Sequence, residues 1–144
     1  MATIRGFSKR IKEIADGVEA NATTMVRKTV ITVASAVALR TPVDTGRARA
    51  NWRTNIGGPL TAPVASFPEG KKGTTGAAAA GMAIQDATDK MAQYKESGRE
   101  VYISNNLIYI DPLNRGSSRQ APAGFIEGAI AAGLKAISQA RLVK

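Results

Sequence analysis

The chain has 144 residues, a formal net charge of +9, and neither cysteine nor histidine. The absent residue types exclude disulfides, thiolate nucleophiles, zinc sites built from Cys and His, and histidine acid–base chemistry. Although 44% of the residues are hydrophobic, only 5% are aromatic and 25 are alanine, so the predicted core is thin. Small chains with thin cores commonly gain stability by forming oligomers.

The first predicted element is a helix over residues 7–40, because apolar residues recur there mostly at helical spacing. Pro42 ends this helix, since the residue before a proline disfavours helical geometry. Such a helix would be about 50 Å long. That length exceeds the diameter of a compact domain of this size, so we expect part of it to protrude or to pack on a neighbouring molecule.

The later elements follow within a single domain, residues 1–144. Asp44 or Thr45 is expected to cap a short helical turn, and residues 52–56 alternate as a strand. After a loop over 57–76, the pattern predicts an alanine-rich helix over 77–95 and a strand over 100–105. Residues 107–110 are either a further strand or the edge of the next element. A final helix is expected to run to about residue 141, with Pro122 in its first turn. The expected fold class is α+β: a long N-terminal helix and a C-terminal helix packed on a small, mainly antiparallel β-sheet, with one long loop.

The loop over 57–76 is rich in Gly and Pro and offers little apolar surface to bury. We expect it to be flexible in an isolated subunit and to act as an assembly arm. Phe67 is its one large aromatic side chain and would dock on a neighbour. Lys71 and Lys72 would face an acidic partner or DNA.

No cofactor, metal site, membrane partner or secretory signal is predicted. No apolar run is expected to reach the roughly 20 residues that span a bilayer. No apolar run follows the basic residues of the N-terminal segment, as a signal peptide would require. The lack of cysteine fits a chain that is made in a cytoplasm.

The tetrapeptide Val43-Asp44-Thr45-Gly46 matches the aspartic-protease signature, and a dimer could supply the two carboxylates that this chemistry needs. Its setting argues against a protease, because it follows a predicted helix rather than a strand and because Arg47 would hold Asp44 ionised. We therefore expect Asp44 to serve as a helix cap, and the chain not to be an enzyme.

The positive charge suggests another alternative, a protein that binds nucleic acid through its phosphates. Arg47, Arg49 and Arg53 could contact phosphate, or could bridge to acids of a neighbouring subunit, which we favour. Trp52 could stack on a base, although a single aromatic residue is more often part of a core.

Two segments carry a resemblance to a known family. The first is residues 42–47, followed by Asn51 and Trp52. The second contains Tyr109, Gly116, Ser118, Gln120, Ala121, Pro122 and Gly124. In this order and on this framework of elements, the chain resembles the tail-completion or neck (head–tail joining) proteins of tailed bacteriophages, the HK97 gp10-like family. Ala48 departs from the bulky aliphatic residue that often follows Gly-Arg in that family.

The resemblance implies a structural protein of the virion, located at the neck or tail and made in the host cytoplasm. It implies a homo-oligomeric, hexameric ring that completes the tail and joins it to the head. The implied partners are the head–tail adaptor and the tail-terminator or tail-tube proteins, and DNA in the lumen of the ring is a further candidate contact. The expected assembly residues are Asp44, Arg47, Arg49, Trp52, Phe67, Lys71, Lys72, Tyr109, Arg115, Ser118, Arg119, Gln120 and Pro122.

Overall fold

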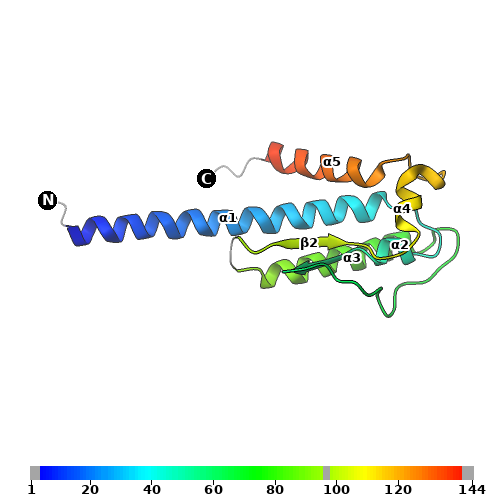
Figure 1. Cartoon of the computed structure of the whole chain (residues 1–144), viewed down its shortest axis with the longest axis horizontal. Helices are drawn as coiled ribbons and strands as arrows, with labels where there is room; N and C mark the ends of the chain where they lie inside the picture. The colour runs from blue at the N-terminus through cyan, green and yellow to red at the C-terminus, as the bar shows by residue number, and fades with distance from the viewer. Residues whose placement is uncertain (1–3, 96–97, 141–144) are drawn as a thin grey trace.

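The computed structural model describes residues 4–95 and 98–140. Helices dominate it, with one small sheet between them (Figure 1). In chain order the elements are α1 (Ile4–Arg40), α2 (Arg47–Ala50), β1 (Arg53–Ile56), α3 (Gly76–Gln93), β2 (Val101–Ser104), α4 (Ile110–Pro112), the π-helical turn η1 (Leu113–Ser117) and α5 (Phe125–Ala140). The predicted α+β class is confirmed.

Helix α1 is the axis of the molecule. In Figure 1 α5 runs along one side of its C-terminal half, while α3 and the sheet lie along the other side. The N-terminal part of α1 extends past all of these elements (Figure 1). With 37 residues the helix is about 55 Å long. The prediction that part of it protrudes is therefore confirmed.

The core lies where α1, α3, α5 and the sheet meet. Its central cluster is dominated by alanine and consists of Val37, Ala38, Trp52, Ala80, Ala83 and Ala129. Small residues also set the spacing between α1 and α5. A Cβ atom on Gly133 would lie 3.0 Å from Val33 Cγ2, so a larger residue there would require Val33 to shift.

The sheet has two antiparallel strands, with Arg53 opposite Ser104 and Ile56 opposite Val101. The outer edge of β1 is covered, because the Thr54 N–H donates to Asp86 Oδ2 of α3 at 2.8 Å. This bond fixes α3 beside the strand. It also satisfies a backbone donor that β2 does not reach.

The segment between β2 and α5 differs in part from the sequence prediction. Residues 107–110 form a turn into α4, the second of the two predicted alternatives, and the Ile110 N–H donates to Leu107 O at 3.1 Å. Helix α5 begins at Phe125, so Pro122 precedes it and does not lie in its first turn. The reason is Gly124, whose φ of +78° is a left-handed backbone conformation that a helix cannot include.

The stretch Asn21–Arg40 of α1 is long and apolar enough to cross a bilayer by length and composition, with a mean hydropathy of 1.2. The expectation that no run reaches this length is therefore wrong. In the fold, Ala34, Val37 and Ala38 of this stretch lie in the core with at most 1% of their surface exposed. Core helices pass the same test of composition, and contact with α3 and α5 accounts for apolar residues at these positions.

Candidate functional site

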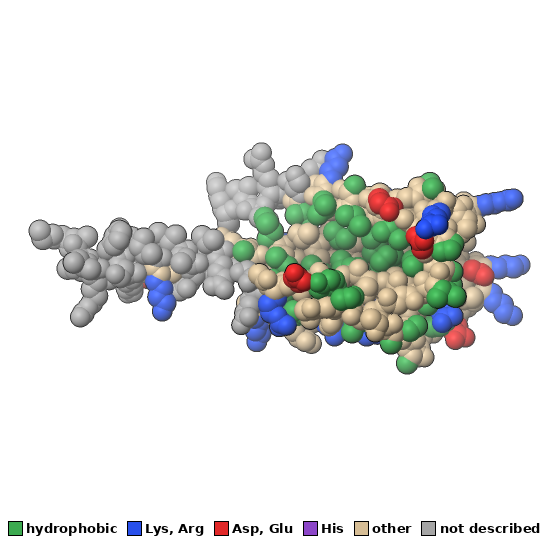
Figure 2. Space-filling model, viewed as in Figure 1, with side chains coloured by type: hydrophobic (Ala, Val, Ile, Leu, Met, Phe, Trp, Pro, Cys, Tyr) green, Lys and Arg blue, Asp and Glu red, His purple; other side chains and the backbone are tan. Residues whose placement is uncertain are grey.

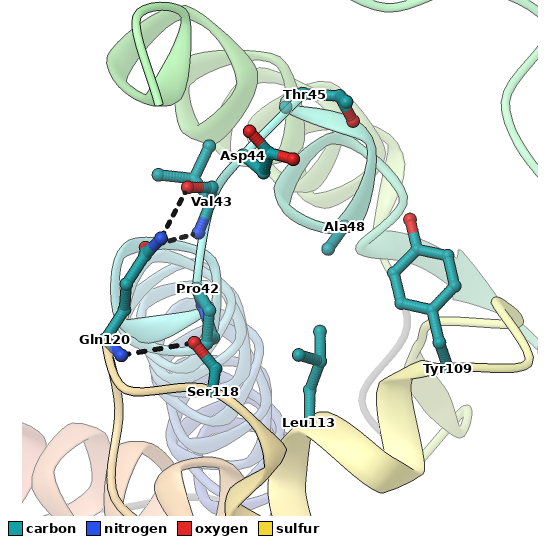
Figure 3. Close-up of a pocket in the computed structure, with 10 residues that line it drawn as sticks. Pro42, Val43, Asp44, Thr45, Ala48, Tyr109, Leu113, Ser118 and Gln120 are labelled. Carbon is teal, nitrogen blue, oxygen red and sulfur yellow. Dashed lines mark hydrogen bonds between the residues drawn. The ribbon is translucent and has the colours of Figure 1, made fainter. Parts of the chain in front are cut away.

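The two segments singled out in the sequence meet at one end of the molecule. The side-chain amide of Gln120 pairs with the backbone of Val43: the Val43 N–H donates to Oε1 at 2.8 Å, and Nε2 donates to Val43 O at 2.9 Å (Figure 3). The partners are 77 residues apart in the chain. One amide thus acts as a neighbouring strand would, and it joins both segments into a single site.

An open pocket of about 290 Å3 lies between these segments. Figure 3 shows Gln120 and Pro42 on one side of it, Tyr109 on the opposite side, and Leu113 and Ala48 directed into the space between. The full lining comprises Pro42, Val43, Asp44, Thr45, Gly46, Ala48, Tyr109, Leu113, Ser118 and Gln120. Its mixed apolar and polar wall suits a side chain or a short peptide segment from another molecule.

Tyr109 is a titratable group of this wall. Partial burial raises the pKa of Tyr109, and the nearby positive charge of Arg47 acts in the opposite direction. Both influences leave the phenol neutral near pH 7. It therefore offers a hydroxyl donor beside an exposed cation.

Asp44 does not cap α2, contrary to the sequence prediction. The residue before α2 is Gly46, which has a left-handed backbone with φ +94° and forms no side-chain cap. Thr45 Oγ1 instead accepts the Arg47 N–H at 3.3 Å. Asp44 Oδ1 accepts the N–H of Lys72 at 3.0 Å, so this carboxylate holds the loop rather than the helix.

This setting differs from that of a protease aspartate. Asp44 is exposed on the connection between α1 and α2, and it does not end a strand. Across residues 4–95 and 98–140, no group of three His, Cys, Asp or Glu residues could hold a metal ion. Asp44 therefore anchors the long loop by accepting a backbone N–H from it.

Arg49 faces inward in the single chain, whereas the sequence predicted it at an interface with a neighbour. Its guanidinium donates to Thr41 O at 2.8 Å, to Leu39 O at 3.0 Å and to Gly76 O at 3.3 Å. The first two carbonyls belong to the C-terminal end of α1, where helices leave carbonyl groups unpaired. Burial lowers the pKa of Arg49. The residue closes the end of α1 and ties it to α3.

Trp52 belongs to the core and not to an interface. Only 7% of its surface is exposed, and its Nε1 donates to Thr41 Oγ1 at 2.7 Å. Thr41 Oγ1 in turn donates to Val37 O at 2.6 Å. A buried indole with a satisfied N–H cannot stack on a base. Trp52 is therefore a core residue, which is the more frequent role of a lone aromatic side chain.

The remaining cations form an exposed rim around the site, which we call the cationic rim. Arg115 pairs with Asp111 at 2.7 Å, one helical turn away, and both side chains are mostly exposed. Among the residues that the structure describes, neither Arg47 nor Arg119 has an ion pair within the chain. The rim consists of Arg47, Lys71, Lys72, Arg115 and Arg119.

The other expected residues are placed as follows. Ser118 Oγ accepts the Gln120 N–H at 3.1 Å and thereby shapes the turn that presents Gln120. Pro122 is exposed beside that turn, and Phe67 is half-buried in the long loop. Ser118 and Gln120 thus belong to the site, Pro122 lies at its margin, and Phe67 stands apart from its lining.

The loop between β1 and α3 is tied to the domain at several points. The Gly70 N–H donates to Thr45 O at 3.0 Å, and the Gly73 N–H donates to Asp44 O at 2.8 Å. Nearer the start of the loop, the Val64 N–H donates to Asn51 Oδ1 at 2.8 Å. The expectation that the loop lacks anchors on its own domain is wrong at these positions. Its proposed role in assembly stays a prediction.

Hydrogen exchange of the free protein can locate these anchors. We expect slow exchange at the amides of Val64, Lys72 and Gly73, and fast exchange at Ala65 and Ser66, which are exposed. Replacing Asn51 with alanine removes the acceptor of Val64 alone, so exchange should accelerate there and remain slow at Gly73. Uniformly fast exchange from 57 to 75 in the wild type would instead indicate a mobile arm.

Sequence reasoning missed Asn114, which organises the start of α5. Its Oδ1 accepts the Ile126 N–H at 2.9 Å, and its Nδ2 donates to both carboxylate oxygens of Glu127, at 3.0 and 2.9 Å. The bonds from Asn114 Nδ2 lower the pKa of Glu127. Asparagine is a good cap by residue type, but this one acts from η1, twelve residues before Ile126. Spacing rules for caps could not have found it.

No family model, curated protein or solved structure matches this chain. The site must therefore be interpreted from its own geometry and from the residues of the two segments.

Proposed function

We propose that the chain is a structural protein of a tailed-bacteriophage virion, which forms a homo-oligomeric ring at the neck that completes the tail and joins it to the head. The observation that carries the proposal is the Gln120–Val43 pairing. The two segments on which the family resemblance rests are distant in sequence, yet this pairing makes them one surface. If these residues served only to shape two separate turns, the two segments would have no reason to contact each other.

The surface has the features of a docking site rather than of a reaction centre. A pocket with mixed lining lies at its middle, and the cationic rim carries exposed charges next in sequence to lining residues, as at Arg47 and Arg119, or bonded to one, as at Lys72. Arg47 and Arg119 are free of ion pairs within the described part of the chain. A guanidinium offers a rigid fork of donors that suits a carboxylate of another subunit. Charge pairs of this kind would fix which surfaces of neighbouring subunits meet and in what relative orientation.

Reversing the charge of both arginines tests the proposal. In the double variant Arg47→Glu, Arg119→Glu we expect no rings by electron microscopy or native mass spectrometry, because both acceptor carboxylates would then meet like charges. The wild type should form rings, alone or with its partner proteins. The helical circular dichroism of the variant should be unchanged, since both side chains are exposed.

A matched control is Lys28→Glu with Lys95→Glu, which changes the net charge equally at exposed positions outside the rim. We expect rings from the control. Normal rings from the Arg47, Arg119 variant would remove these residues from the interface, and a wild type that never forms rings with neck partners would overturn the proposed function.

The cationic rim also supports a second candidate, binding of nucleic acid. Phosphate contacts release counterions, so affinity for DNA would fall steeply with salt. The same double variant distinguishes the two functions. Under the nucleic-acid alternative it should weaken DNA binding and reduce the slope of log affinity against log salt by about one for each lost contact, while any assembly persists.

A further inference from the structure

The N-terminal part of α1, residues 4–20, is a helical arm that lies beyond the rest of its own chain (Figure 1). Its sequence has apolar residues at alternating spacings of three and four: Ile4, Phe7, Ile11, Ile14 and Val18. On a helical backbone these positions share one side. This is the pattern by which a helix packs along another helix.

Helix α5 carries an apolar strip that its own chain leaves partly uncovered. The strip consists of Ile126, Ile130, Leu134 and Ile137, which share one side of the helix. Ile126 packs against the core, whereas Ile130 is 39% exposed and Leu134 is 50% exposed. Figure 2 shows hydrophobic side chains gathered on the face where α5 lies along α1. We refer to these four residues as the α5 strip.

The arm and the α5 strip match in length and in spacing. Seventeen helical residues of the arm measure about 25 Å, and the 16 residues of α5 measure about 24 Å. Phe7, Ile11 and Ile14 follow each other at intervals of four and three, as do Ile130, Leu134 and Ile137 when α5 is read in the same direction. Parallel helices therefore bring these residues together in pairs, Ile11 beside Leu134.

Charge favours the same direction. Residues 4–12 of the arm carry four basic residues and no acid, and residues 13–19 carry three acids and no base. Helix α5 has Glu127 in its first turn and Lys135 in its second half. In the parallel register Glu127 lies beside Arg5, and Lys135 lies beside both Lys12 and Glu13, whereas the opposite direction places Glu127 beside the acidic half of the arm and Lys135 beside its basic half.

We propose that the arm of one subunit packs in parallel on the α5 strip of a second copy of this chain, and that the two copies are related by a two-fold axis. Within one chain α5 runs antiparallel to α1, because Gly133 adjoins Val33 and Gly128 adjoins Arg40. An arm parallel to the partner's α5 is thus antiparallel to the partner's α1. Two antiparallel α1 helices are equivalent by two-fold symmetry, so each arm covers the α5 strip of the other copy.

This contact is independent of the proposed function, since it uses neither the pocket nor the cationic rim. The partner copy would cover the exposed Ile130 and Leu134. Variants of the two surfaces can therefore fail separately. If the arm contact proves absent, the ring proposal still stands. If the Arg47, Arg119 variant forms no rings, the proposed dimer still stands.

Engineered disulfides test the register, because the chain has no cysteine of its own. The variant Ile11→Cys, Leu134→Cys should form covalent dimers on mild oxidation. Ile11 lies about 33 Å along α1 from Val33, the neighbour of Gly133, so a bond within one chain is out of reach. The control Ile11→Cys, Ala136→Cys places the second thiol at an exposed position about 160° around α5 from Leu134 and should cross-link at least tenfold more slowly.

Sedimentation equilibrium of the full chain provides the second measurement. In the Arg47→Glu, Arg119→Glu background, which lacks the proposed ring contact, we expect a dimer, a monomer on adding Leu134→Glu and a dimer on adding Ala136→Glu, all with the same helical circular dichroism. A monomer in this background without a change on α5 overturns the inference. So does equal cross-linking of both cysteine pairs, or an oligomer that Leu134→Glu leaves intact.

Discussion

Replacing Trp52 with alanine is expected to destabilise the domain by about 3–5 kcal/mol. The indole is the largest side chain of a core made mainly of alanine, and only 7% of its surface is exposed. Its removal also leaves Thr41 Oγ1 without the Nε1 donor. Since small domains have a total stability of about 5–15 kcal/mol, much of the protein should unfold under mild denaturant. Urea unfolding followed by circular dichroism measures the loss.

Two variants make this measurement specific. Trp52→Phe keeps most of the apolar contact and loses the hydrogen bond, so it should cost less than the alanine variant. Ile108→Ala removes a side chain that is 95% exposed, and its stability should stay within about 0.5 kcal/mol of the wild type. A Trp52→Ala protein as stable as Ile108→Ala would show that the indole does not support the core.

The second large effect is expected at Gly46, in the first segment and directly before α2. Its φ is +94°, and a left-handed backbone costs a residue with a side chain about 1–2 kcal/mol. A Cβ atom there would also lie 2.7 Å from Pro68 O and 2.9 Å from Thr75 Oγ1. Gly46→Ala must therefore displace the end of the long loop as well. We expect a loss of stability clearly larger than the backbone cost alone.

Gly81 offers a matched control for the same substitution. It lies in α3, and a Cβ atom there would meet nothing within 4 Å. Because glycine within a helix is less stable than alanine by about 0.5–1 kcal/mol, Gly81→Ala should stabilise the domain. Thermal or urea unfolding of the two variants should thus shift in opposite directions. Equal shifts would contradict the close packing of the loop on Gly46.

The order of helices and strands could be predicted from the sequence because the patterns behind it are local. The stripe of α1, the alternation of β1 and the alanine-rich stretch of α3 each indicate their element without reference to distant residues. The region from 107 to 124 could not be predicted in the same way. There the backbone follows left-handed glycines at 116 and 124 and a cap supplied from another element by Asn114.

The site was predictable as segments but not as individual side chains. Gln120 and Asp44 lie where the two segments meet, as the motifs indicated. Arg49 has the same residue type as Arg47 and lies two positions away, yet its guanidinium faces the carbonyls at the end of α1. Residue type gives the chemistry of a side chain. The direction in which it points depends on where α2 lies against α1 and α3, which no local pattern contains.

The long separation between Gln120 and Val43 has a consequence for the order of events during folding. Closing a loop of 77 residues costs more chain entropy than forming any helix turn, so this pairing should form after the helices have packed. A nascent or partly folded chain would then contain both halves of the site without the surface that they create together. In the proposed ring, such a subunit would engage its neighbours only after its C-terminal segment had closed on its N-terminal one, so that recruitment would depend on completion of the fold.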